Sequence, residues 1–219
     1  MDFSSYFKKY ETLVKNIDDV CAKVKNEYGD CVVCKPGCAD CCHALFDLTL
    51  IEAMYIKQKF DENFAGKIKH EIITYADKAD RKIFKLKKDA SEADKMGINS
   101  HKIIERISKE KIACPLLDDT NTCMMYEYRP IACRVYGIPT SAAGIGHTCG
   151  LSGFVKGTPY PTLNMDSVYK QLYSISNSMV FDIKSKFKKM GDVLVPVSMC
   201  LLTDYNEEYL GLPSLKVVD

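Results

Sequence analysis

The sequence lacks the features that would place a protein in a membrane, on nucleic acid or in a secretory route. No stretch approaches the roughly 18 consecutive apolar residues that a membrane-spanning helix needs. The formal net charge is +1, which gives no general attraction to nucleic acid or acidic membranes. The first nine residues show no basic segment followed by an apolar one, so we expect no secretory signal. These absences favour a soluble, cytoplasmic protein with neither a membrane nor a nucleic-acid partner.

Motifs of several common enzyme classes are also missing. We find no nucleophile–base pair, no phosphate-binding loop and no paired acid motif. The Gly144-Ile145-Gly146 run has no preceding strand pattern, which argues against a Rossmann-type methyltransferase. Residues 65–111 hold 13 Lys and Arg against 8 Asp and Glu, a pattern that we interpret as the solvated face of a helix. The sequence therefore leaves substrate and reaction open.

The spacing of apolar residues predicts a mainly α protein. With 219 residues, 47% of them hydrophobic, the chain suits one domain over residues 1–219. In the first 28 residues, apolar side chains recur every three or four positions, as in an amphipathic helix. A second helix is predicted from Thr49, whose hydroxyl caps it while Glu52 reaches back. Further helices are expected at about residues 63–86, 103–107, 166–190 and 198–210, with a short extended piece at 193–197.

A helical insert at about residues 61–111 is expected between the two cysteine-rich segments. Its first helix carries an apolar stripe that includes Ile68, Ile72, Tyr75 and Ala79. We expect this stripe to face the core.

What the chain has in excess is cysteine. It contains eleven, and five of them lie within residues 31–42. An odd number of cysteines without a secretory signal indicates a reducing compartment, where clustered thiols are metal ligands or catalysts. Disulfide bonds are the alternative interpretation of these cysteines, and it would apply if the protein were secreted.

A second irregular segment follows the insert. Residues 114–161 are rich in cysteine, glycine and proline, and six of the twelve glycines lie within residues 137–161. Such a stretch reads as a long loop, which is uncommon in a compact domain unless something else organises it. We therefore expect both cysteine-rich loops to converge on one metal centre.

The two segments resemble the two signatures of one family. The run Cys34-x3-Cys38-x2-Cys41-Cys42 resembles the signature of the YkgJ-type cysteine-cluster proteins, which are assigned to zinc or iron chelation. The later run, Cys-Pro-Leu-Leu, then Cys, then Tyr-Glu-x-Arg-Pro-x-x-Cys-Arg-x-Tyr, resembles that family's second signature, here within residues 114–136. The usual first spacing is CxxCxxCC, and this chain has one extra residue before Cys38.

The resemblance covers roughly residues 34–60 and 114–150 and implies metal chelation. Flagellin lysine methylases resemble the chain more distantly through their cysteine run, and they are associated with a [4Fe-4S] centre and methyl transfer. This resemblance implies an iron–sulfur centre without assigning methylase activity.

Eight cysteines are the candidate metal ligands: Cys34, Cys38, Cys41, Cys42, Cys114, Cys123, Cys133 and Cys149. This number suffices for two four-ligand sites, or for one site with spare thiols. Cys31, His43 and His147 are left open as ligands. Cys21 and Cys200 lie in apolar patterns and are interpreted as core residues.

Four further residues are the candidate cofactor-binding residues. A four-thiolate site carrying Zn²⁺ or a [4Fe-4S]²⁺ core has a net charge of about −2. The guanidinium groups of Arg129 and Arg134 would offset it. The alternative is that Arg129 pairs with Glu127 or a helix end. Tyr126 and Tyr136 are expected to shield the site from water, or to be ordinary core residues.

Thiolate ligands suit either a [4Fe-4S] cluster or structural zinc. One dense run plus widely spaced single cysteines differs from the paired CxxC knuckles of zinc sites, which favours the cluster. Three functions remain open: iron–sulfur redox or group-transfer chemistry, a structural zinc module that binds a protein partner, and metal storage or delivery. If the chain is an enzyme, it is an iron–sulfur-dependent oxidoreductase or a methyl-transfer-type enzyme.

Overall fold

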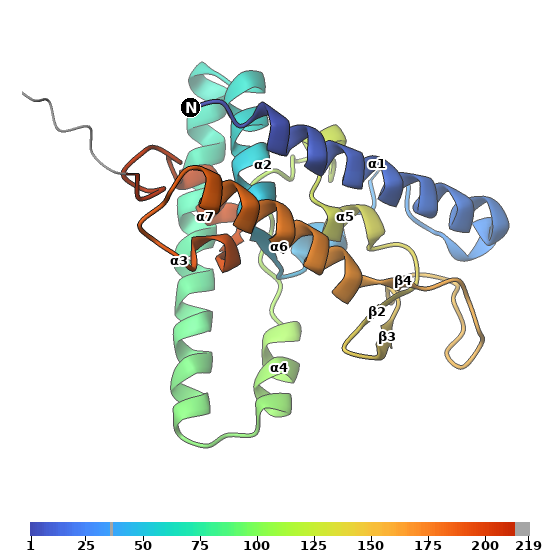
Figure 1. Cartoon of the computed structure of the whole chain (residues 1–219). Coiled ribbons are helices and arrows are strands. Elements are labelled where there is room, and N and C mark those ends of the chain that lie inside the picture. Colours follow the sequence, from blue (N-terminus) through green and yellow to red (C-terminus); the bar gives the residue numbers. More distant parts are fainter. Residues whose placement is uncertain (36, 213–219) are drawn as a thin grey trace, which may run out of the picture.

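The computed structural model describes residues 1–35 and 37–212, including all side chains in these ranges except those of residues 104 and 108. The fold is mainly α, as predicted (Figure 1). The α-helices are α1 (Ser4–Glu27), α2 (Leu50–Asn63), α3 (Gly66–Lys95), α4 (Ser100–Ser108), α5 (Ile131–Val135), α6 (Met165–Asp182) and α7 (Val197–Leu202). No helix in these ranges is long and apolar enough to span a membrane.

Short strands and single 3₁₀ turns connect the helices. The turns are Gly29–Cys31, Cys41–His43, Tyr126–Tyr128 and Met190–Asp192. The strands are β1 (Asp47–Thr49), β2 (Thr140–Ala142), β3 (Ile145–His147), β4 (Leu163–Asn164) and β5 (Leu194–Pro196). β1 pairs antiparallel with β5, with Leu48 opposite Val195. β2 pairs antiparallel with β3 and parallel with β4.

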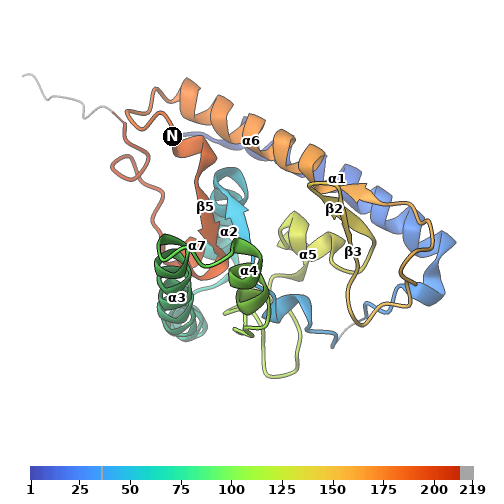
Figure 2. The ribbon, with the colours of Figure 1, turned by 90° about the horizontal axis from the view of Figure 1, so that it is seen from below.

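Four helices, α1, α2, α6 and α7, enclose the core and are called the helical frame below. α2 packs against α1, α6 and α7, and α1 runs beside α6 (Figures 1 and 2). α1 buries Phe7, Tyr10, Ile17 and Val24, which confirms most of its predicted stripe. Because α2 has neighbours on several sides, it is buried along most of its length.

The predicted cap of α2 is present and does more than end a helix. The Glu52 carboxylate accepts hydrogen bonds from the Thr49 N–H, at 3.1 Å, and from the Thr49 hydroxyl, at 2.9 Å. The Ile51 N–H at the start of the helix donates to the hydroxyl oxygen of Ser176 on α6 at 3.2 Å. Burial of this helix start is possible because its N–H groups have partners.

α3 and α4 form an arm that extends from the frame (Figures 1 and 2). α3 packs on α7, and Ile72 and Ala79 of its predicted stripe are buried. The rest of that stripe is not buried, since Ile68 is 57% and Tyr75 61% exposed. The prediction fails there because periodicity marks a helix face and does not say whether a partner covers it.

Three predicted boundaries were wrong. The stretch 114–161, read as a loop, contains α5 and strands β2 and β3. The helix expected to reach residue 190 ends at Asp182, where Lys184 takes a left-handed φ of 54°. The Lys184 N–H donates to the Phe181 carbonyl oxygen and the Ser185 N–H to that of Val180, a Schellman stop formed without glycine. The helix expected at 198–210 is the shorter α7.

Candidate metal site

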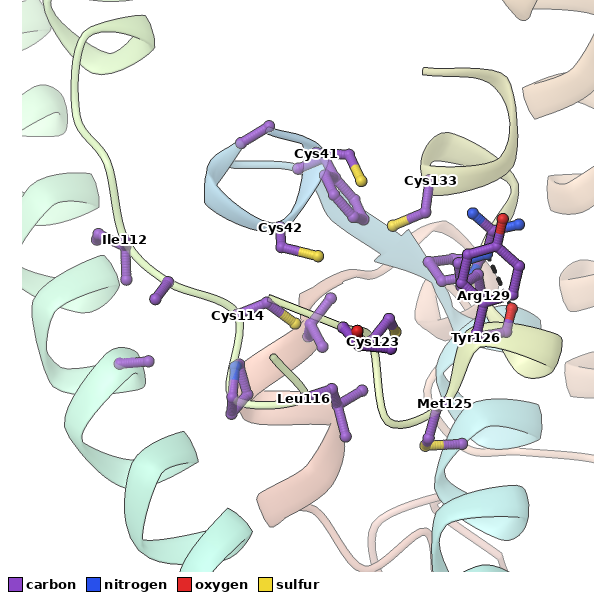
Figure 3. Close-up of a pocket in the computed structure, with 18 of the residues that line it drawn as sticks. Cys41, Cys42, Ile112, Cys114, Leu116, Cys123, Met125, Tyr126, Arg129 and Cys133 are labelled. Carbon is purple, nitrogen blue, oxygen red and sulfur yellow. Dashed lines mark hydrogen bonds between the residues drawn. The ribbon is translucent and has the colours of Figure 1, made fainter. Parts of the chain in front are cut away.

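Cysteines from both segments line one cavity of about 230 Å³. Its lining includes six of them: Cys38, Cys41, Cys42, Cys114, Cys123 and Cys133. Figure 3 shows five of these around a shared space, with Arg129 and Tyr126 at one side. Apolar side chains such as Ile112, Leu116 and Met125 form much of the remaining wall. This cavity is called the cysteine pocket below.

Backbone hydrogen bonds hold the two segments against each other at the pocket. The Cys114 N–H donates to the Cys42 carbonyl oxygen at 2.7 Å, which joins the segments across the α3–α4 arm. Within the second segment, a β-bridge pairs Leu117 with Cys123, and the Met124 N–H donates to the Leu116 carbonyl oxygen at 2.8 Å. The second segment therefore returns on itself and brings two thiols to the same wall.

Glu52 provides a second connection between the segments. Its side chain is 3% exposed. One carboxylate oxygen accepts from Thr49, just before α2, and the other accepts from the Ile131 N–H at 3.1 Å, at the start of α5. Because α5 carries Cys133, the carboxylate fixes where this thiol enters the pocket. Burial raises the pKa of Glu52, and the hydrogen bonds from Thr49 and Ile131 oppose that rise.

Three cysteine sulfurs accept a hydrogen bond from the backbone N–H two residues further along. The Leu116 N–H donates to Cys114, and the Met125 N–H donates to Cys123. Outside the pocket, the Leu151 N–H donates to Cys149 Sγ at 3.4 Å. An N–H directed at sulfur stabilises the charged thiolate over the neutral thiol. Burial outweighs this stabilisation, and the pKa of each of the three thiols is raised.

Thiols in the pocket interact closely enough to change one another's ionisation. Hydrogen bonds from Cys133 and Cys42 lower the pKa of Cys41, and the same contacts raise the pKa of those two donors. Burial raises the pKa of Cys114 to about 12. Ionisation of Cys41 is therefore favoured over ionisation of Cys42 and Cys133.

The pocket is not an assembled coordination shell. Within residues 1–35 and 37–212, no three His, Cys, Asp or Glu side chains form a group that could already hold a metal ion. Convergence of the thiols on a metal centre therefore stays a prediction.

Two of the eight candidate ligands lie outside the pocket lining. Cys34 is exposed, and Cys149 is 8% exposed. The Cys149 sulfur lies 3.8 Å from Asp40 Oδ2. Burial is the main cause that raises the pKa of Cys34, and the nearby thiols of Cys38 and Cys149 raise it further. Cys38, which lines the pocket, adds to the effect of burial in raising the pKa of Cys34 and of Cys149.

The two candidate arginines occupy different places. Arg129 lines the pocket, its guanidinium carbon lies 3.5 Å from the centre of the Tyr126 ring, and its Nε donates to the Tyr126 carbonyl oxygen. Arg134 pairs with Asp18 at 2.7 Å and donates to the carbonyl oxygens of Arg129 and Glu127. Arg134 thus joins α5 to α1, whereas Arg129 is positioned to face a charge in the pocket.

The two candidate tyrosines are also separated. Tyr126 lines the pocket and is 56% exposed. Tyr136 lies beside Asp40 instead, and burial together with the interaction with that carboxylate raises the pKa of Tyr136 to about 12.

The open candidates are placed as follows. Cys31 is half-buried, and its carbonyl oxygen accepts from the Gly153 N–H at 2.9 Å. His43 Nδ1 lies 2.9 Å from the Ala39 carbonyl oxygen, and His147 is exposed on β3. Cys200 is buried, as predicted, and its thiol donates to the Ala53 carbonyl oxygen at 3.1 Å.

Cys21, also predicted to be a core residue, is only half-buried, and its thiol donates to the Arg134 carbonyl oxygen at 3.7 Å.

Sequence reasoning missed two acidic residues at the site. Asp40 stands between Cys38 and Cys41, and its place inside the cysteine run was a signal that could have been used. Glu52 was found only as a helix cap, and nothing in the sequence indicates that it also reaches α5.

The fold is mainly helical, and its central pocket is rich in thiols. The chain matches the family model CxxCxxCC, described as "Putative zinc- or iron-chelating domain", over residues 33–150. This match covers more than half of the chain, so the chain belongs to the CxxCxxCC family. The resemblance drawn from its two cysteine signatures is thereby confirmed. No curated protein and no solved structure matches the chain.

Proposed function

We propose that the chain holds a thiolate-ligated metal centre in the cysteine pocket, and that this centre is an iron–sulfur cluster used in redox or group-transfer chemistry. The observation that carries the proposal is the joint lining of one cavity by thiols from two distant segments, joined by the bond from Cys114 to Cys42. Membership of a zinc- or iron-chelating family supports the metal.

The donor set fits such a group. Thiolates bind iron–sulfur clusters and zinc, and harder ions prefer oxygen ligands. Four sulfurs close around one zinc ion at about 2.3 Å, so a zinc site needs no cavity, whereas the cysteine pocket measures about 230 Å³. We assign the centre to the six pocket cysteines, which offer two thiols more than four ligands require: Cys38, Cys41, Cys42, Cys114, Cys123 and Cys133.

The surrounding residues have separable roles in this proposal. Ile112, Leu116 and Met125 exclude water from the thiolates, which strengthens their interaction with a cation. Arg129 offsets the negative charge of a four-thiolate centre. A bound cluster would supply electron transfer or an open iron for group transfer. All eleven cysteines are free, which supports a reducing compartment such as the cytoplasm.

Structural zinc remains the second candidate, because the N–H groups directed at Cys114 and Cys123 suit a closed zinc site equally well. The protein would then be an interaction module with a protein partner. Metal storage or delivery is the third candidate.

Anaerobic purification followed by visible spectroscopy and quantitation of iron, sulfide and zinc separates these candidates. We expect a coloured protein with iron and acid-labile sulfide in equal amounts. The Cys123→Ser variant should lose this colour, and the Cys21→Ser variant should keep it because Cys21 lies outside the pocket lining. A colourless protein that contains zinc and no sulfide would overturn the cluster and favour the structural module.

A further inference from the structure

We infer that the chain has a binding site for a small zwitterion, a molecule that carries both a carboxylate and an ammonium group, as a free amino acid does. The site is a cavity lined by α1, by α2 and by the Tyr126–Tyr128 turn. It is called the tyrosine cavity below, after Tyr10, Tyr55 and Tyr128 in its lining. The inference goes beyond the proposed function and does not depend on which metal the cysteine pocket holds.

The tyrosine cavity has the size of a small-molecule site and no net charge. Its volume is about 340 Å³, and small-molecule sites measure roughly 300–1,000 Å³. Arg129 and Tyr128 line both this cavity and the cysteine pocket, so they form a common wall. The ionisable groups of the lining, other than tyrosines, are three acids and three bases: Glu11, Asp18, Glu127, Lys15, Arg129 and Arg134. Because their charges cancel, the cavity does not favour a simple anion or cation over a molecule that carries both charges.

Two of the three acids have partners within the lining itself. Arg134 Nη1 donates to the Asp18 carboxylate at 2.7 Å, and the Tyr55 hydroxyl donates to the Glu11 carboxylate at 3.0 Å. The other guanidinium nitrogens of Arg134 donate to backbone carbonyl oxygens. These groups therefore hold the walls of the cavity together.

The remaining charged groups of the lining are available to a ligand. Lys15 and Glu127 are exposed, and within the described residues neither side chain has an ion-pair or hydrogen-bond partner. Arg129 uses only its Nε, on the Tyr126 carbonyl oxygen, and its two terminal nitrogens make no hydrogen bond to the described part of the chain. A guanidinium and an ammonium group bind a carboxylate, and a carboxylate binds an ammonium group. The unpaired groups are thus the complement of a zwitterion.

An unpaired hydroxyl in the floor of the cavity is independent evidence for a ligand. Tyr10 is 1% exposed, and among the residues that the structure describes its hydroxyl has no hydrogen-bond partner. Buried polar groups without a partner are rare because they are costly. Burial raises the pKa of Tyr10 well above its usual value, so the hydroxyl keeps its proton and can donate it in a hydrogen bond. A carboxylate oxygen of the ligand would supply the missing acceptor.

The test is isothermal titration calorimetry of the full chain with a free amino acid. A thermal-shift screen of the common L-amino acids first selects the tightest binder. Its methyl ester lacks the carboxylate charge, and its N-acetyl derivative lacks the ammonium charge. We expect each derivative to bind at least roughly 10-fold more weakly than the parent, because each loses a hydrogen bond between charged groups.

Variants assign each half of the ligand to its partner. Glu127→Gln should weaken binding of the amino acid roughly 10-fold or more and leave the affinity for the N-acetyl derivative unchanged. Lys15→Met should weaken binding of the amino acid and leave the affinity for the methyl ester unchanged. Tyr10→Phe should also weaken binding, and it should not lower the melting temperature, because it removes an unpaired buried donor. Lys23→Met, exposed on α1 and outside the lining, is the matched control.

The inference is overturned if no free amino acid binds, or if either derivative binds as tightly as the parent. It is equally overturned if Glu127→Gln, Lys15→Met or Tyr10→Phe binds the amino acid with wild-type affinity. Far-UV circular dichroism checks that each variant folds, and the two exposed positions carry the test if Tyr10→Phe does not fold. Quantitation of iron, sulfide and zinc tests the proposed function separately, so the two can fail independently.

Discussion

The helical frame and the cysteine-bearing segments are stabilised by different means. In the frame, residues such as Leu50, Phe60 and Met179 are fully buried, and their stability comes mainly from apolar burial. In the segments at 31–46 and 111–125, most cysteines are half-buried and single backbone hydrogen bonds make the connections. The frame is complete without a ligand, whereas the segments gather thiols whose ionisation a cation would favour.

This difference implies that metal and fold are coupled locally. A site that organises its own loops gains folding free energy from the metal, and this gain should be confined to the segments. The frame should set overall stability, and the segments should respond to the metal. The predictions below test that division, starting with the largest expected effect.

Leu172→Ala should destabilise the protein by about 2–5 kcal/mol, because it leaves a cavity in the core. Leu172 lies on α6 and is 1% exposed. Urea unfolding followed by circular dichroism measures the loss, and metal content per folded molecule should not change. Lys170→Ala, on the exposed face of α6, is the control and should stay within about 0.5 kcal/mol of wild type. Loss of metal from folded Leu172→Ala would show that frame and segments are not separable.

Removing metal with a chelator under reducing conditions should cost about 2.7 kcal/mol, if the metal is present at about 100 times its dissociation constant. Trypsin should then cut faster after Lys111, which is exposed next to Cys114 in the second cysteine-bearing segment, while the helical signal of the frame persists. Timed proteolysis with mass spectrometry locates the cuts. Unfolding of the whole chain on chelation, or unchanged cutting after Lys111, would contradict local coupling.

Glu52→Gln should destabilise the protein by about 1–3 kcal/mol, because an amide cannot accept hydrogen bonds on both sides as the carboxylate does. One donor, on Thr49 or Ile131, would then be left buried without a partner. Since Ile131 begins α5, Cys133 should shift and metal affinity should fall as well. Chemical unfolding and metal titration give the two readouts. Glu62→Gln, exposed near the end of the same helix, should change neither.

The stabilities of wild type and of Glu52→Gln should also depend differently on pH. Burial raises the pKa of Glu52 in the folded protein above its usual value of 4.5. The folded state therefore binds more protons between the unfolded and folded pKa values, and wild type loses stability as pH rises through that interval. Glu52→Gln does not titrate there, so its deficit relative to wild type should shrink as pH rises. A deficit that grows with pH would show that the hydrogen bonds outweigh burial.

Arg129→Met should have the smallest effect on stability, about 1 kcal/mol or less, because stacking on exposed Tyr126 contributes little. Metal should be retained. If the pocket holds a cluster, loss of the positive charge should make its reduction potential more negative, which anaerobic redox titration measures. Arg81→Met, exposed on α3, is the control. An unchanged potential would mean that Arg129 does not sense the centre.

The sequence alone determined the helical class, most of the α1 stripe, the cap of α2 and the family. Periodicity and capping are local properties, and cysteine spacing is read directly from the chain. Burial of Ile68 and Tyr75 could not be determined in this way, because it depends on whether another element covers that part of α3. The end of α6 was missed because Lys184, not glycine, takes the left-handed position.

Only the tertiary structure decided which thiols are neighbours. Cys114 meets Cys42 across an arm of two helices, and Cys149 meets Asp40 from more than a hundred residues away. Such pairings depend on how the frame positions its loops and on groups such as Glu52 that join α2 to α5. Sequence spacing predicted the candidate ligands. Only the folded chain determines on which side of the Cys41–Cys42 turn each of them lies.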